Sequence, residues 1–114
     1  MKRMTNDEKK LLANLVLDLL QNNNDNITLL NSKAIIRIIP TIGNDVNLRK
    51  IINLLRQNGE PIISSNRGYR YTTDIVDLFL YSHSLKLRIM EITRAYTGLI
   101  TYVKENTPEI NDFI

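Results

Sequence analysis

The chain has 114 residues, a formal net charge of +3 and no cysteine, with 43% hydrophobic and 24% charged residues. This length suits one domain with an appended helix better than a two-domain enzyme, and the lack of cysteine excludes disulfides, thiolate metal sites and cysteine nucleophiles. No apolar run approaches the roughly 18 residues that a membrane span needs, and the N-terminus lacks the apolar stretch of a signal peptide.

The first predicted element is a helix from Thr5 to about Gln21. Thr5 to Asp7 supply candidates for its N-cap, and Asp7 and Glu8 place negative charge in the first turn, where it complements the helix dipole. Its apolar stripe at helical spacing consists of Leu11, Leu12, Leu15, Val16, Leu19 and Leu20. The polar run at residues 21–26 predicts a loop, because Asn and Asp side chains compete for backbone hydrogen bonds.

Two short elements follow the polar loop. The segment from Ile27 to Leu30 predicts an extended piece, placed to add a third strand to a later hairpin. A second helix is predicted from Lys33 to about Ile39, because Pro40 cannot continue it. A tight turn follows, in which Ile42 is expected to be buried. Asn31 or Ser32 is expected to cap this helix, and the side chains expected to face inward are Ala34, Ile35, Ile38 and Ile39.

The stretch from Asn44 to Thr73 combines a third helix with a β-hairpin. Asp45 is a plausible N-cap for this helix, and Gly59 lies where a helix commonly closes at positive φ. The apolar stripe of the helix consists of Leu48, Ile51, Ile52 and Leu55. Extended runs at residues 62–64 and 69–72 flank a turn with Asn and Gly at residues 66–68, which predicts a hairpin.

The order of these elements is that of a winged helix-turn-helix domain, which we predict for residues 1–73. Positive charge is concentrated in its second part. Between Asn31 and Thr72 there are seven cations and two anions, a balance of +5, whereas the remainder of the chain carries eight cations and ten anions. The predicted fold class is mainly α, with a small hairpin or three-stranded sheet. The concentration of positive charge in this module is suited to nucleic acid.

From about residue 27 to residue 90 the chain resembles the small winged helix-turn-helix proteins encoded by bacteriophages and related mobile elements. The likeness is most specific from Leu48 to Tyr71, where LRKIINLLRQNGEPIISSNRGYRY follows the family form LRKIINxLRxNGxPIISSNxGYYY. The chain departs from the commoner pattern at residues 39–42, where a helix usually runs on into a Gly-containing turn. The resemblance implies binding to double-stranded DNA in lysogeny control or at replication origins, with the third helix as reader and the wing as an accessory contact.

The candidate DNA-binding residues lie on the third helix, the wing and the second helix. Asn and Arg side chains can form paired hydrogen bonds with base edges in the major groove, whereas cations elsewhere contact phosphates. The alternative is a polar helix face that only contacts solvent. The candidates are Asn44, Asn47, Arg49, Lys50 and Asn53 for the groove, with Arg67, Arg70 and Lys33 for the backbone or minor groove. Tyr69 and Tyr71 are expected to pack on the core instead.

Residues 74–105 predict a long C-terminal helix, about 48 Å at 1.5 Å per residue, with Thr73 or Asp74 as its cap. Apolar residues spaced alternately three and four apart predict a coiled-coil seam over four heptads, with one polar member: Ile75, Leu78, Ser82, Leu85, Ile89, Ile92, Tyr96, Leu99 and Val103. The seam indicates a homodimer, or packing of this helix along the first one. Gly98 is unfavourable in a helix interior, and the tail at residues 106–114 is expected to be loosely held.

The sequence contains no nucleophile elbow, phosphate loop or metal motif, and His83 is its only histidine. We therefore expect a non-enzyme without catalytic residues, metal, cofactor or small-molecule ligand. The expected function is that of a dimeric DNA-binding protein, either a transcriptional regulator or an origin-binding replication protein. The alternative is an adaptor that uses the winged-helix scaffold to bind a host or phage protein. We expect a cytoplasmic location without a membrane partner, in a bacterial host cell if the protein is phage-encoded.

Overall fold

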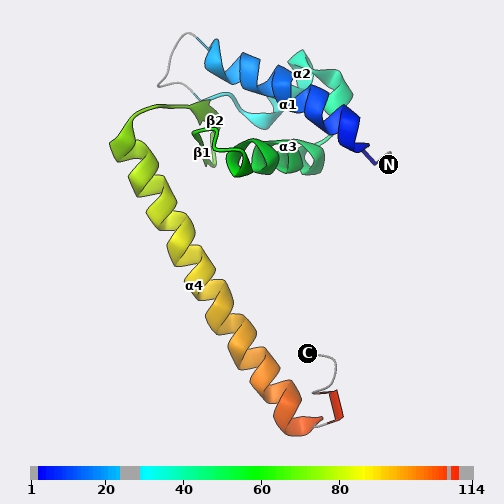
Figure 1. Cartoon of the computed structure of the whole chain (residues 1–114), viewed down its shortest axis with the longest axis vertical. Helices are drawn as coiled ribbons and strands as arrows, with labels where there is room; N and C mark the ends of the chain where they lie inside the picture. Colours follow the sequence, from blue (N-terminus) through cyan, green and yellow to red (C-terminus); the bar gives the residue numbers. More distant parts are fainter. Residues whose placement is uncertain (1–2, 24–28, 108, 111–114) are drawn as a thin grey trace. The chain divides into compact units, whose positions relative to one another are not determined.

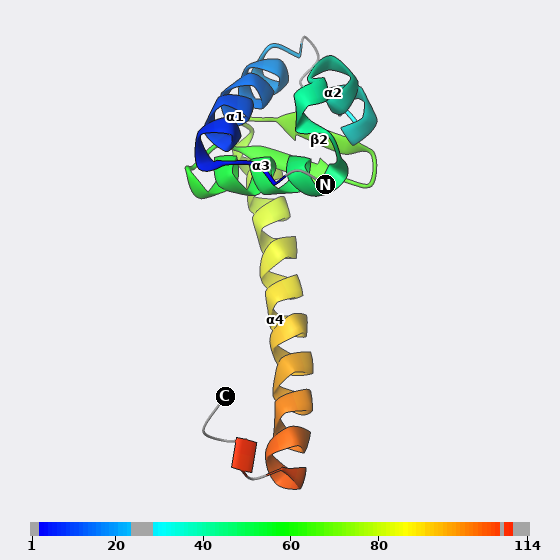
Figure 2. The ribbon, with the colours of Figure 1, turned by 90° about the vertical axis from the view of Figure 1, so that its right-hand side faces the viewer.

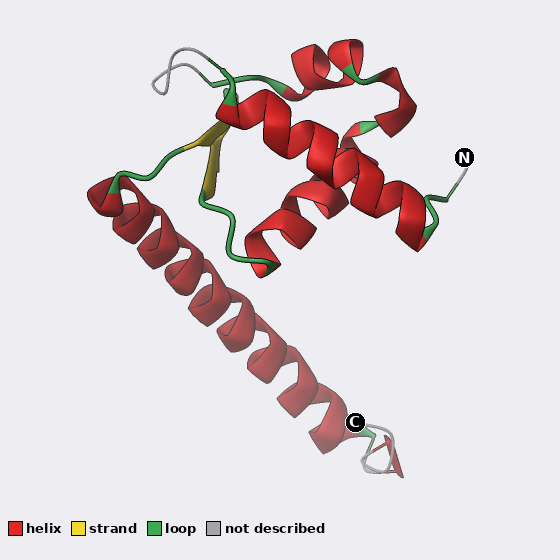
Figure 3. Cartoon of the chain, turned by 45° about the horizontal axis from the view of Figure 1, so that its top comes forward, coloured by secondary structure: helices red, strands yellow, loops and turns green. Residues whose placement is uncertain are grey.

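The computed structural model describes residues 3–23, 29–107 and 109–110. The chain forms two compact units, Met1–Leu78 and Phe79–Ile114. Helices dominate the described residues, which also contain a two-stranded antiparallel hairpin and a long C-terminal helix (Figure 3). The division between the units falls five residues beyond the predicted boundary at residues 73 and 74, so the first turn of the long helix belongs to the first unit.

Helix α1 (Asn6–Gln21) opens the first unit (Figure 1). The hydroxyl of Thr5 accepts a hydrogen bond from the Glu8 amide at 3.1 Å, which confirms Thr5 as the N-cap. The predicted apolar stripe is wider than the face that the core covers. Leu12, Ala13, Val16 and Leu20 are buried against α3 and the hairpin, whereas Leu11 and Leu15 are exposed.

Helix α2 (Ser32–Ile38) is capped by Asn31, whose side chain accepts from the Ala34 amide at 2.8 Å. Ile35 is fully buried, but Ile38 is 57% exposed, so the prediction that Ile38 faces inward is wrong. Ile39 packs against the core as predicted, and Ile36, which was not predicted to face inward, packs there as well. The 3-10 turn η1 (Pro40–Ile42) follows, and its Ile42 is fully buried as expected.

Helix α3 (Asp45–Gln57) packs on α1 (Figure 2). The four residues of its predicted stripe are all buried: Leu48, Ile51, Ile52 and Leu55. Gly59, at φ 89°, ends the helix in a Schellman motif. Its amide donates to the carbonyl of Arg56 at 2.9 Å, and the amide of Glu60 donates to the carbonyl of Leu55 at 3.0 Å. The exit of the chain towards the hairpin is thereby fixed.

Strands β1 (Ile62–Ser65) and β2 (Gly68–Tyr71) form the predicted hairpin, in a register that pairs Ile62 with Tyr71 and Ser65 with Gly68. A third chain segment touches it through one isolated bridge. Leu30 and Tyr69 exchange two backbone hydrogen bonds of 2.8 Å each. The expected strand at residues 27–30 is thus limited to this bridge in the described chain, because residues 27 and 28 lie outside it.

Glycine is required where the hairpin turn meets this bridge. Gly68 has φ 135°, and a Cβ atom added there would overlap the backbone carbonyl of Leu30. Among the described residues, only glycines have positive φ. The positive φ of the turn therefore falls on Gly68 and not on Asn66. Tyr69 and Tyr71 pack against the core, which confirms their expected structural role.

Helix α4 (Ile75–Asn106) runs without interruption through Gly98, although glycine is unfavourable in a helix interior (Figure 2). The side chain of Asp74 caps it by accepting from the amides of Val76 at 2.9 Å and Asp77 at 3.3 Å. None of the side chains of α4 is buried. Most of the expected tail, residue 108 and residues 111–114, lies outside the described residues.

Candidate nucleic-acid interface

One face of α3 presents basic and amide side chains to solvent. Arg49, Lys50 and Asn53 are all exposed, and their spacing places them on the side of the helix opposite the buried stripe. Val46 and Gln57 are also exposed and share this face at helical spacing. Neither was among the predicted residues, although positions 46, 50, 53 and 57 follow the helical repeat.

Asn44 lies at the start of this helix as its N-cap. Its side-chain oxygen accepts a hydrogen bond from the Asn47 amide at 2.9 Å, which satisfies one of the free amides of the first turn. The cap is therefore Asn44 and not Asp45. The side-chain oxygen of Asn44 is thus occupied within the protein, which leaves it less suited to contact a base.

Asn47 was predicted on the exposed face, and that placement is wrong. The residue is 9% exposed, and its side-chain amide donates to the backbone carbonyl of Ile42 at 2.9 Å. The amide thus bridges the turn before α3 to the first turn of the helix. Because the hydrogen bond is buried, it serves the positioning of α3, and Asn47 is removed from the candidate interface.

A substitution test follows for the Asn47 bridge. We expect Asn47→Ala to lower the free energy of unfolding by about 1–3 kcal/mol, because the buried carbonyl of Ile42 loses its donor. Asn53→Ala, on the same helix but exposed, should change it by no more than about 0.5 kcal/mol. Urea denaturation followed by circular dichroism measures both, and equal effects would contradict the structural role of Asn47.

Two further predicted cations are exposed on other elements. Arg67 lies in the two-residue loop between β1 and β2, and Lys33 lies in the first turn of α2. The backbone amide of Arg67 donates to the Ser65 hydroxyl at 3.1 Å, which shapes the loop that carries it. Both side chains are on the surface, where they can contact a phosphate backbone.

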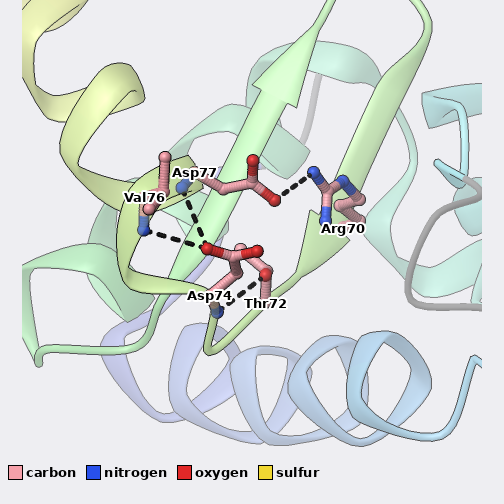
Figure 4. Close-up of polar contacts among 5 residues, drawn as sticks. All are labelled: Arg70, Thr72, Asp74, Val76 and Asp77. Atoms are coloured by element: carbon pink, nitrogen blue, oxygen red, sulfur yellow. Dashed lines mark hydrogen bonds and ion pairs between the residues drawn. The ribbon is translucent and has the colours of Figure 1, made fainter.

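Arg70 has a partner inside the first unit. Its guanidinium donates to the Asp77 carboxylate at 2.9 Å, and the two side chains are 18% and 37% exposed (Figure 4). Figure 4 also shows that Asp74 accepts from the amides of Val76 and Asp77, while Thr72 accepts from the Asp74 amide at 3.1 Å. The ion pair therefore joins β2 to the first turn of α4, and Arg70 contributes less to the candidate interface than predicted.

Arg56 is likewise engaged within the protein. Its Nε donates to the Ile62 carbonyl at 2.8 Å and its guanidinium reaches the Ser64 hydroxyl at 3.1 Å, which ties the last turn of α3 to β1. Of the seven cations between Asn31 and Thr72, the five exposed ones are Lys33, Arg37, Arg49, Lys50 and Arg67. The positive charge available to a partner is thus carried by two helices and the hairpin loop.

Other kinds of site find little support in the described part of the chain. It contains no group of three or more His, Cys, Asp or Glu residues that could hold a metal ion. Over the same residues, no helix combines the length and the apolar character that crossing a membrane requires. Comparison of the chain with models of protein families, with curated proteins and with solved structures finds no match.

Proposed function

We propose that residues 1–73 form a winged helix-turn-helix domain that binds double-stranded DNA. The observation that carries the proposal is the exposed face of α3, on which Arg49, Lys50 and Asn53 stand together opposite the buried stripe. The order of α2, a tight turn, α3 and a hairpin supports the same assignment, because it supplies a helix for the major groove and a wing beside it.

The proposed contacts divide into two kinds. Arg49 and Asn53 read base edges, since guanidinium and amide groups form paired hydrogen bonds with guanine and adenine. Lys33, Lys50 and Arg67 contact phosphates, which fix the position of the domain on the duplex without reading its sequence. Asn47 and Arg56 take part indirectly, because they hold α3 to the turn before it and to the hairpin after it.

The resemblance to phage-encoded winged-helix proteins favours a role as transcriptional regulator or as origin-binding replication protein. Both roles need recognition of a particular sequence. The proposed mechanism involves no bond making or breaking and no cofactor: the domain occupies a DNA site and thereby changes access for other proteins.

Selection of bound sequences from a random duplex pool tests this proposal. Enrichment of a motif is the expected result, and fluorescence anisotropy on the enriched duplex should then show affinity that falls steeply with salt. Three phosphate contacts from one domain correspond to a slope of about −3 in log K against log salt concentration. If the pool yields no bound duplex at low salt, the proposal fails and the adaptor function becomes the better account.

A further inference from the structure

Within the second unit, helix α4 carries an apolar stripe whose side chains are exposed. Ile89, Ile92, Tyr96 and Leu99 are each exposed by more than half, with Leu99 reaching 71%. They follow one another at spacings of three and four, which keeps them on one side of the helix. Apart from two residues in 3-10 conformation at 109–110, the described residues of the second unit form no other helix or strand.

The residue types along the stripe distinguish between kinds of helix pairing. In heptad notation, the a positions are Ile75, Ser82, Ile89, Tyr96 and Val103, and the d positions are Leu78, Leu85, Ile92 and Leu99. β-Branched residues thus hold three of five a positions, and leucine holds three of four d positions. In parallel coiled coils, this distribution favours two strands over three or four.

We propose that α4 pairs with α4 of a second copy of this chain as a parallel, two-stranded coiled coil. The length of the helix supports this choice of partner, because 32 residues provide more than four heptads and a sustained repeat of three or more is typical of coiled coils. A stripe with this repeat is complementary to itself, so an identical helix fits it at every layer. Ser82 is the one small polar member, and it disfavours shifted registers that would place it against an apolar side chain.

The parallel direction has a consequence for DNA recognition. Because α4 follows the first unit in the chain, parallel pairing brings both first units to the same end of the coil. The two α3 helices, one from each copy, then contact the two related halves of one DNA site, as in dimeric helix-turn-helix proteins. This consequence rests on the proposed function, whereas the pairing itself does not, and the tests below use no DNA.

Light scattering on the full chain, combined with two matched substitutions, tests the pairing. We expect the wild type to be a dimer, Leu85→Asp at a d position to be a monomer, and Leu87→Asp two residues away to remain a dimer. Leu87 is an exposed leucine outside the a and d positions, so it controls for loss of apolar character and for added charge. A monomeric wild type at high micromolar concentration, or equal dissociation of both variants, would overturn the proposal.

Single cysteines test the direction, because the natural chain has none. In a parallel pair Leu99→Cys faces itself and forms a disulfide-linked dimer under mild oxidation, while Thr101→Cys on the outer face cross-links several-fold more slowly. In a centred antiparallel pair, residue 99 lies opposite residue 82 and about 25 Å from its own copy. Cross-linking that needs Ser82→Cys and Leu99→Cys together would overturn the parallel arrangement, as would equal cross-linking at residues 99 and 101.

Discussion

Replacing Arg49 and Lys50 together by alanine is expected to lower the affinity for the selected duplex by about 30-fold or more. The base-edge contact of Arg49 contributes roughly 1–3 kcal/mol, and about 1.4 kcal/mol corresponds to a factor of ten in affinity. Loss of the phosphate contact of Lys50 lowers the affinity further. Both side chains are exposed on α3, so their loss should leave the fold intact. Fluorescence anisotropy at one fixed salt concentration measures the change.

A charge-matched variant separates a local contact from a general loss of positive charge. Lys9→Ala combined with Lys10→Ala removes the same two charges from α1, outside the proposed interface. Its affinity should stay within about threefold of the wild type, since screening weakens distant charges at physiological salt. If the two double variants lose affinity equally, α3 is not the reading helix.

The largest expected effect on stability comes from Gly68→Ala. The residue has φ 135°, which a side chain rarely adopts and which alone costs about 1–3 kcal/mol. The added Cβ would also overlap the carbonyl of Leu30, which forms the bridge to Tyr69. We therefore expect a loss of at least about 3 kcal/mol in the free energy of unfolding of the first unit, or failure to fold at room temperature.

Gly98→Ala provides the matched control for this glycine substitution. Gly98 lies inside α4, and a Cβ added there would meet no atom within 4 Å. Alanine should stabilise the helix there by about 0.5–1 kcal/mol, because glycine loses more conformational freedom on folding. Thermal unfolding followed by circular dichroism compares the two variants, and a stable Gly68→Ala protein would contradict the described turn.

The parts of the fold that sequence could predict are those set by neighbouring residues. The cap at Thr5, the buried stripe of α3 and the glycine that closes α3 depend on local spacing and on backbone preferences. The hairpin also follows from local signals, because the turn at residues 66–68 lies between two runs with strand preference. These signals are present in the chain before any long-range contact forms.

The predictions that are wrong concern contacts between different elements of the fold. Asn47 carries a polar side chain and was placed on the exposed face of α3, but the turn at Ile42 directs a carbonyl towards it. Arg70 was counted as available charge, but the chain returns after the hairpin and places Asp77 beside it. Ile38 follows Ile35 at helical spacing, which predicts that both are buried on one face of α2, yet Ile38 is exposed. Counting charged or apolar residues does not show which of them are paired or buried in the folded chain.

The central claim is that the exposed face of α3 meets duplex DNA, and NMR mapping of backbone amides on titration with the selected duplex tests it most directly. We expect the largest shifts at Arg49, Lys50 and Asn53, with smaller ones at Arg67 in the hairpin loop and at Lys33 in α2. Unchanged signals along α3, with shifts confined to α1 or to residues 79–106, would contradict it.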